Sequence, residues 1–201
     1  MAKLNVFLSW SGERRKAVAS ALNDWLPPVI NAVRPFFSSD TEKGVDWFEK
    51  ITENLQNSTG IFCLTPENLD SPWLHFEAAA LHKGLTTSRL WTLLLFDLKP
   101  TDVKRSLGAI QHTLPTKEDM KKMLTSINTM CGDDAIPVGV LESALEAHWD
   151  RLSKAFQEAS KIVIGSTAQT RSSESMLEEL LLDEHRRSHS GWAAPPQQRA
   201  V

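Results

Sequence analysis

Trp73 and Glu77 place an indole and a carboxylate four residues apart in the segment SPWLHFEAAALHKG. Ser71 suits a helix N-cap, the proline after it suits the first helical position, and Gly84 suits the helix end. Residues four apart share a helix face, with Cβ atoms about 5–6 Å apart. An ionised acid can stabilise positive charge, and an indole gives a flat apolar surface for stacking. By spacing alone a solvated glutamate and a packing tryptophan are commoner, so the remaining sequence must show whether the pair faces a cleft.

The bulk composition indicates one buried core, because 201 residues with 41% apolar content are too few for two typical domains. A formal charge of −3 and short basic clusters such as Arg14-Arg15-Lys16 do not favour nucleic acid as a partner. Cys63 and Cys131 form neither a disulfide framework nor a metal site by spacing, and the six histidines lack zinc-ligand spacing. The N-terminal apolar run is too short for a signal peptide, and no stretch is long enough to span a membrane. We therefore expect a cytoplasmic protein without a metal site.

Nearly continuous apolar runs alternate with amphipathic segments, which is typical of a parallel sheet covered by helices on both faces. In such an α/β sheet, ligands bind beyond the carboxyl ends of the strands, where the strand-to-helix loops gather. Those loops are expected at 9–12, 38–44 and 66–71. The helix that carries Trp73 and Glu77 begins at the same edge, which favours a functional role for the pair. Strands are expected at Leu4–Ser9, Arg34–Ser38, Thr59–Thr65 and Arg89–Phe96.

Helical periodicity predicts the covering layers, and Pro27-Pro28 is expected to end the first helix. The segment Asp97–Thr113 has few periodic positions and reads as a long connection. Beyond Ile164 the composition changes to Ser, Thr, Arg, Glu, Pro and Gln, which indicates a domain at 1–160 and a C-terminal extension at 161–201. The extension contains one candidate helix, which either docks or forms transiently, and then a disordered tail. Helices are expected at Glu13–Trp25, Asp46–Leu55, Pro72–Lys83, Lys117–Ile127, Val138–Ala159 and, in the extension, Glu174–Arg187.

Four segments resemble the Toll/interleukin-1 receptor (TIR) domain of the prokaryotic type. The segments are NVFLSWSGERR, SSDTEKGVDWFEKI, GIFCLTPENLDSPW and SPWLHFEAAAL, and the resemblance runs from about Lys3 to Phe156. It implies a flavodoxin-like α/β fold with a parallel five-stranded sheet and helices on both faces. Ala135–Val138 is our candidate for the fifth strand.

The resemblance also implies site residues, because many TIR domains cleave NAD at the bond between nicotinamide and ribose. Glu77 falls at the position of the family's catalytic glutamate, and Trp73 matches an aromatic residue that stacks on the nucleotide. The segment from Ser9 to Arg14 corresponds to the family's first site loop, near the phosphates or ribose of the ligand, and Ser9 and Trp10 are its residues expected at the ligand. The segment 38–47 resembles the BB loop, which gates the site and contributes to assembly. Its residues expected near the ligand are Ser38, Asp40, Lys43 and Trp47.

The implied activity is that of an NAD+ nucleosidase in bacterial antiphage defence, with NAD as substrate and no other cofactor. Nicotinamide in NAD is a cationic leaving group, so one carboxylate suffices to stabilise an oxocarbenium-like transition state. The products are nicotinamide and either ADP-ribose or a cyclic ADP-ribose isomer. The expected partners are further copies of the chain, through TIR-TIR contacts, and a sensor or effector protein of a defence system, with no nucleic acid and no membrane.

Two other functions remain open at this point. One is a non-enzymatic adaptor that acts by TIR-TIR association, and the other is an enzyme like the nucleoside deoxyribosyltransferases, acting on free deoxynucleosides. The first strand is not followed by a GxGxxG loop, which argues against a Rossmann dehydrogenase.

Overall fold

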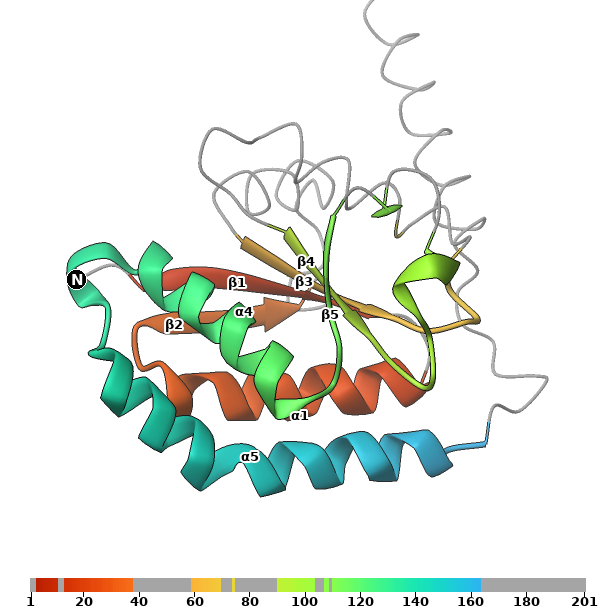
Figure 1. Ribbon diagram of the computed structural model, residues 1–201. Coiled ribbons are helices and arrows are strands. Elements are labelled where there is room, and N and C mark those ends of the chain that lie inside the picture. Colours follow the sequence, from red (N-terminus) through yellow and green to blue (C-terminus); the bar gives the residue numbers. More distant parts are fainter. Residues whose placement is uncertain are drawn as a thin grey trace, which may run out of the picture. The chain divides into compact units, whose positions relative to one another are not determined.

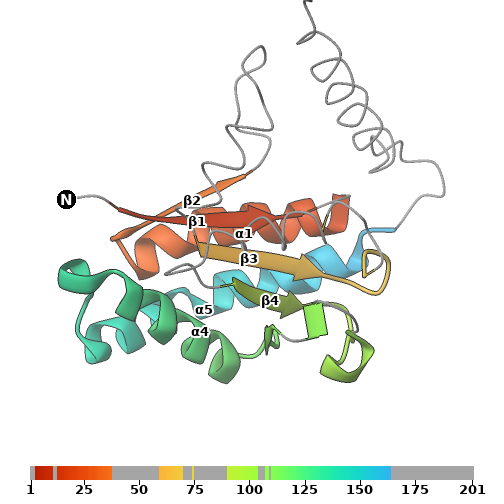
Figure 2. The ribbon, with the colours of Figure 1, turned by 90° about the horizontal axis from the view of Figure 1, so that it is seen from above.

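A computed structural model describes residues 3–10, 13–37, 59–69, 74, 90–103, 107–108 and 110–163. The strands of these residues form a five-stranded sheet in the order β2-β1-β3-β4-β5, and every neighbouring pair is parallel (Figures 1 and 2). This is the strand order of a flavodoxin-like doubly wound sheet, so the predicted fold class is confirmed. The strands are β1 (Leu4–Ser9), β2 (Val33–Phe37), β3 (Thr59–Leu64), β4 (Leu90–Leu94) and β5 (Gln111–Thr113).

The order of the strands reverses at β1. The chain first adds β2 on one side of β1, and then adds β3 on its other side, with Val6 of β1 opposite Thr59 of β3. A doubly wound sheet has a crevice beyond the carboxyl ends of the two strands at such a switch point. The loops that follow β1 and β3 therefore define the edge at which a ligand is expected.

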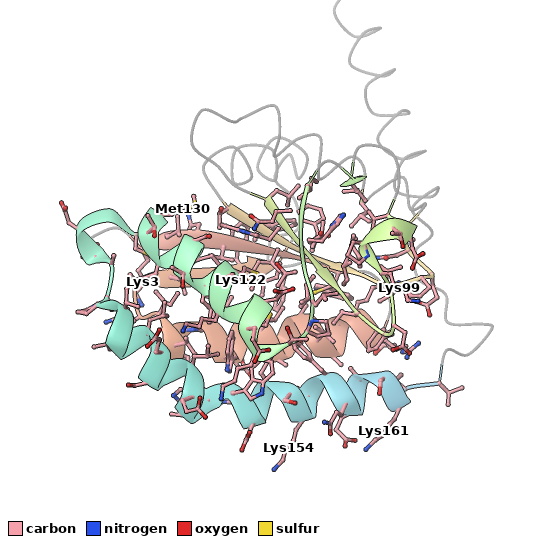
Figure 3. All side chains as sticks on the ribbon, in the orientation of Figure 1. Lys3, Lys99, Lys122, Met130, Lys154 and Lys161 are labelled. Atoms are coloured by element: carbon pink, nitrogen blue, oxygen red, sulfur yellow. The ribbon has the colours of Figure 1, made fainter. Side chains whose placement is uncertain are left out.

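Three helices pack on one face of the sheet: α1 (Glu13–Val29), α4 (Lys117–Met130) and α5 (Val138–Lys161) (Figure 1). Alternate strand residues such as Val6, Ile61 and Trp91 point into this layer, as the two-residue period of a strand requires. Lys154 and Lys161 extend from α5 on the side away from the sheet (Figure 3). Short 3₁₀ helices lie at Pro100–Asp102 (η2) and Gly132–Asp134 (η4).

A second buried cluster covers the opposite face of the sheet. It includes Phe7 of β1 and Phe62 of β3, whose rings meet edge to face with centroids 6.1 Å apart. Leu74 is helical and buried in the same cluster. Buried apolar residues therefore cover both faces of the sheet, as predicted, whereas the helix expected at 72–83 lies outside the described residues apart from Leu74.

The prediction that Pro27 and Pro28 end the first helix is wrong, because α1 continues to Val29. Both prolines lie on the outer side of the helix, whereas Trp25, Leu26 and Val29 are buried in the core. The indole N–H of Trp25 also donates to the carbonyl of His148 in α5, at 2.9 Å. Packing of the inner face thus outweighs the loss of two helical N–H donors.

The predicted fifth strand at Ala135–Val138 is also wrong. The fifth strand is instead β5, which is three residues long and lies at the end of the segment that we expected to be a connection. It pairs with β4, and His112 lies opposite Thr92. The chain around Ile136 is extended, but the backbone of Ile136 forms hydrogen bonds with the side chain of Asn128 and not with a strand. The amide of Ile136 donates to Asn128 Oδ1 at 2.9 Å, and its carbonyl accepts from Asn128 Nδ2 at 2.8 Å.

The other predicted elements among the described residues are confirmed with small shifts of their ends. Pro35 was expected at a strand start or edge, and β2 is an edge strand of the sheet. Helices α4 and α5 extend three and two residues beyond their predicted ends, at Met130 and Lys161. The predicted helix at 46–55 lies outside the described residues, as does the C-terminal extension from residue 164 onwards. None of the helices in the described ranges has the length and apolarity that crossing a membrane requires.

Candidate functional site at the carboxyl edge

Of the predicted site residues, the structure describes Ser9 and Trp10. Ser9 is buried at the carboxyl end of β1, opposite Phe62 of β3. Trp10 is half-buried against the core, and the Lys16 ammonium lies 5.6 Å from the centre of its ring. A packing role for Trp10 is thus visible, and contact of either residue with a ligand stays a prediction. Six predicted site residues lie outside the described ranges: Trp73, Glu77, Ser38, Asp40, Lys43 and Trp47.

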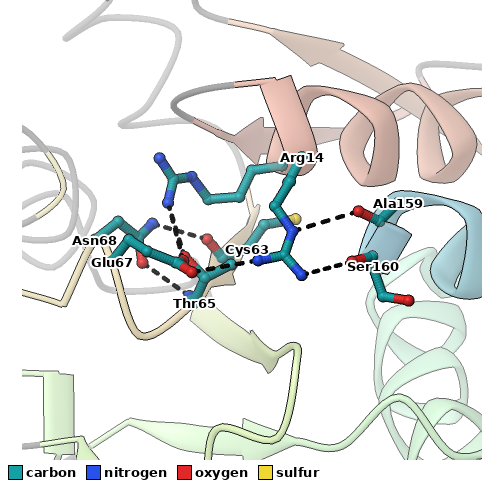
Figure 4. Close-up of polar contacts among 8 residues, drawn as sticks. Arg14, Cys63, Thr65, Glu67, Asn68, Ala159 and Ser160 are labelled. Carbon is teal, nitrogen blue, oxygen red and sulfur yellow. Dashed lines mark hydrogen bonds and ion pairs between the residues drawn. The ribbon is translucent and has the colours of Figure 1, made fainter. Parts of the chain in front are cut away.

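Arginines from the first turn of α1 meet the turn after β3 at the switch point (Figure 4). Arg15 Nη1 donates to Thr65 Oγ1 at 2.7 Å and lies 3.8 Å from Glu67 Oε2. Arg14 Nη1 donates to Glu67 Oε1 at 3.3 Å. One carboxylate is therefore shared by two guanidinium groups, and the first turn of α1 meets the turn after β3 at this edge.

Arg14 makes three further contacts. Its Nε donates to the carbonyl of Ala159 at 3.4 Å, and its Nη2 donates to the carbonyl of Ser160 at 2.9 Å, in the last turn of α5. The centre of the guanidinium lies 4.0 Å from the ring centroid of Phe96, just after β4. Arg14 thus contacts segments that follow β3 and β4 as well as the end of α5.

Asn68 fixes the turn after β3 from inside. Its Oδ1 accepts from the amide of Thr65 at 2.8 Å, and its Nδ2 donates to the carbonyl of Cys63 at 3.0 Å. Asn68 and Thr65 are both buried, so these polar groups depend on one another for hydrogen bonds. The turn that leads toward Trp73 and Glu77 in sequence is therefore held in one conformation by a carboxamide.

The electrostatics of the edge follow from partial burial beside opposite charges. Burial lowers the pKa of Arg15, and the neighbouring Glu67 carboxylate opposes this shift. Burial raises the pKa of Glu67, but the Thr65 hydroxyl and the two arginines outweigh it, so its pKa lies below its ordinary value. At neutral pH the two arginines and Glu67 are charged and carry a net positive charge. The edge is suited to attract an anionic group such as a phosphate.

Cys63 does not supply a nucleophile to this edge. Burial raises the pKa of its thiol to about 12, although the positive charge of Arg15 acts in the opposite direction. The thiol is therefore protonated at neutral pH and poorly nucleophilic. Within the described part of the chain, no group of three or more His, Cys, Asp or Glu side chains is arranged to hold a metal ion.

A separate cavity lies at the amino edge of the sheet, away from the switch point. Its volume is about 230 Å³. Burial, and then the charge of Asp134, raise the pKa of the Cys131 thiol there, so the cavity lacks a reactive thiolate. The residues that line it are Lys3, Leu4, Asn5, Ala32, Met130, Cys131 and Asp134.

Sequence reasoning placed Arg14 at the end of the first site loop, near the phosphates or ribose of the ligand, but it treated Arg15 only as part of a short basic cluster and predicted none of the contacts that the two arginines make. A signal was present in their position, because positive side chains in the first turn of a helix are disfavoured by the helix dipole. Two arginines directly after the N-terminal residue of α1 therefore require acceptors from elsewhere in the fold. Glu67, Thr65 and the end of α5 supply those acceptors.

Comparisons with known proteins find likenesses among solved structures. No protein-family model matches the chain, and a search of curated proteins also finds no match. Among solved structures, the chain is similar to the TIR domains of the activated Roq1 resistosome, a structure that directly recognises the pathogen effector XopQ. The identity is 14% and the TM-score 0.39, over 90% of this chain and 99% of that chain. A likeness of this size assigns no residue role and no activity.

Proposed function

We propose that this chain is a TIR-domain NAD+ nucleosidase that cleaves the bond between nicotinamide and ribose. The observation that carries the proposal is the contact between the first turn of α1 and the turn after β3 at the switch point of a flavodoxin-like sheet. The turn held by Asn68 leads in sequence directly to the segment with Trp73 and Glu77. Leu74, inside that segment, is helical and buried against the sheet, as a helix at 72–83 requires.

In the proposed reaction the glycosidic C–N bond breaks, and its electron pair stays on the nicotinamide nitrogen. Positive charge develops on the ribose, and the Glu77 carboxylate stabilises it electrostatically. Trp73 stacks on an aromatic ring of the ligand, a contact worth about 1–3 kcal/mol by analogy with bases stacked on aromatic side chains. Attack of water on the ribose carbon, with loss of a proton, gives ADP-ribose. Attack by a nucleophile within the bound nucleotide gives a cyclic isomer.

The described residues contribute charge and shape to this proposal. Arg14, Arg15 and Glu67 together carry a net positive charge, which suits a ligand with a diphosphate. The turn from Thr65 to Leu69 is fixed by buried hydrogen bonds, and a fixed support is what precise placement of a catalytic helix needs. Action in the cytoplasm, in antiviral defence and through self-association of TIR domains belongs to the same proposal and rests on the resemblance of the sequence motifs.

The test is a substrate comparison with the purified chain at several protein concentrations. NAD and a set of deoxynucleosides are incubated separately, and the products are separated by chromatography. We expect nicotinamide from NAD and no free base from the deoxynucleosides. Release of base from deoxynucleosides alone would identify a deoxyribosyltransferase-like enzyme, and no cleavage of either substrate under any condition would leave the adaptor function as the better account.

A further inference from the structure

We propose that Arg14 couples the end of α5 to the turn after β3, so that release of the last turn of α5 loosens the carboxyl-edge site. The coupling itself stands on contacts of described residues. Its consequence for catalysis rests on the proposed function.

The end of α5 offers Arg14 two backbone acceptors. The last carbonyls of an α-helix carry the negative end of the helix dipole, which favours a cation beside them. Arg14 donates to Ser160 O at 2.9 Å and to Ala159 O at 3.4 Å, and Ala159 O also accepts from the amide of Ile162 at 3.3 Å. The guanidinium acts as a cap that comes from a different helix.

The same guanidinium holds the turn after β3. Arg14 Nη1 pairs with Glu67 Oε1, and the second oxygen of Glu67 lies near Arg15 (Figure 4). The Glu67 side chain is 37% exposed, so the ion pair alone is weak. Its geometry depends on an Arg14 that is already oriented by the α5 carbonyls.

Phe96 gives Arg14 a fixed platform. Phe96 and Asp97 both have positive φ, at 56° and 64°. Residues other than glycine rarely adopt this backbone conformation, and a bulky residue such as phenylalanine does so least often. The surrounding structure must therefore hold this turn, and Phe96 packs against the buried cluster between the sheet and helices α1, α4 and α5. With its face fixed on this ring, the guanidinium can reach the α5 carbonyls and Glu67 at once.

Opening the last turn of α5 would remove two of these acceptors. Arg14 would keep only its exposed pair with Glu67 and its contact with Phe96, and the turn after β3 would lose an oriented partner. The chain continues from α5 toward residue 164, so a protein that binds or pulls this end has a physical route to the turn that precedes Trp73 and Glu77. Arg14 is a positioning residue in this scheme.

The experiment is amide hydrogen exchange on the full chain. Ser160→Pro opens the last turn, because proline lacks the N–H donor and clashes with the preceding turn. We expect exchange at the amide of Asn68, which donates to Thr65 O, to rise by up to about fivefold, the factor for losing the contribution of a partly exposed ion pair. Ser160→Ala is the matched control, since it keeps the carbonyl that Arg14 uses, and should leave exchange at Asn68 unchanged.

The second half of the experiment asks whether the effect passes through Arg14. Arg14→Gln should raise exchange at Asn68 by itself, and adding Ser160→Pro should then raise it no further. Arg14→Lys serves if the glutamine variant does not fold, and Arg151→Gln, at an exposed arginine paired with Asp24, controls for loss of charge. Two results would overturn the coupling. One is that Ser160→Pro speeds exchange only at the end of α5 and not at Asn68. The other is that Ser160→Pro raises exchange at Asn68 by the same factor whether residue 14 is arginine or glutamine. NAD turnover is measured separately, so inactivity of the wild-type chain would count against the proposed function and not against the coupling.

Discussion

Asn68 offers a sharp test of how the turn after β3 is held. Its carboxamide satisfies two backbone groups, the amide of Thr65 and the carbonyl of Cys63, and all three residues are buried. Asn68→Ala leaves both groups without their side-chain partner and places no polar atom near enough to replace it. The variant therefore tests whether this one side chain defines the turn.

The magnitude follows from the burial. Leaving a buried donor or acceptor unsatisfied costs about 1–3 kcal/mol. Two such groups, at 2.8 and 3.0 Å from the carboxamide, predict a loss of about 2–6 kcal/mol in the free energy of unfolding. Urea unfolding, followed by tryptophan fluorescence and circular dichroism, measures this loss.

Asn23→Ala is the matched control for this variant. The Asn23 amide donates to the neighbouring Asp24 carboxylate on the surface, at 3.2 Å. Its removal should change the free energy of unfolding by less than about 0.5 kcal/mol. If Asn68→Ala were no more destabilising than this control, and exchange at the Thr65 amide stayed slow, the account of the turn would be refuted.

Three further variants test other parts of the structure. Asn128→Ala should destabilise by about 2 kcal/mol, because Ile136 loses both backbone partners; urea unfolding measures this, and a loss below about 0.5 kcal/mol would contradict it. Thr116→Ala removes the N-cap of α4, whose hydroxyl accepts from the Asp119 amide at 3.3 Å, and should cost about 1 kcal/mol in the same assay; no loss relative to Thr125→Ala would contradict it. Glu67 has a lowered pKa, so its ionised form contributes stability above its ordinary pKa that is lost as pH falls through the lowered value. Glu67→Gln should therefore be less stable than wild type at neutral pH, by less than about 1 kcal/mol because the pair is partly exposed; a difference that did not shrink in acid would contradict the linkage.

The fold was predictable where burial dominates the sequence. Strands β1, β3 and β4 are buried on both faces, so their residues form nearly continuous apolar runs with clear ends. β5 gave no such signal, because it is a short edge strand with the sequence QHT. Its place depends on pairing with β4, where Thr92 Oγ1 lies 2.6 Å from His112 Nδ1. The spacing of apolar residues along the sequence does not predict such a tertiary pairing.

The same distinction applies to the candidate site. The edge at which the loops gather follows from the alternation of strands and helices, and that expectation agrees with the contacts between α1 and the turn after β3. The partners of Arg14 could not be predicted, because Ala159 and Ser160 are far away in sequence and contribute only backbone carbonyls. Every residue type has a backbone carbonyl, so the sequence does not indicate which carbonyls accept from Arg14.

The central claim is tested most directly by nicotinamide release from NAD, measured side by side for the wild-type chain and Glu77→Gln. Glu158→Gln, which removes a carboxylate from the exposed surface of α5, serves as the matched control. The account predicts release by the wild type and by Glu158→Gln, and none by a folded Glu77→Gln variant. Undiminished release by Glu77→Gln would contradict it.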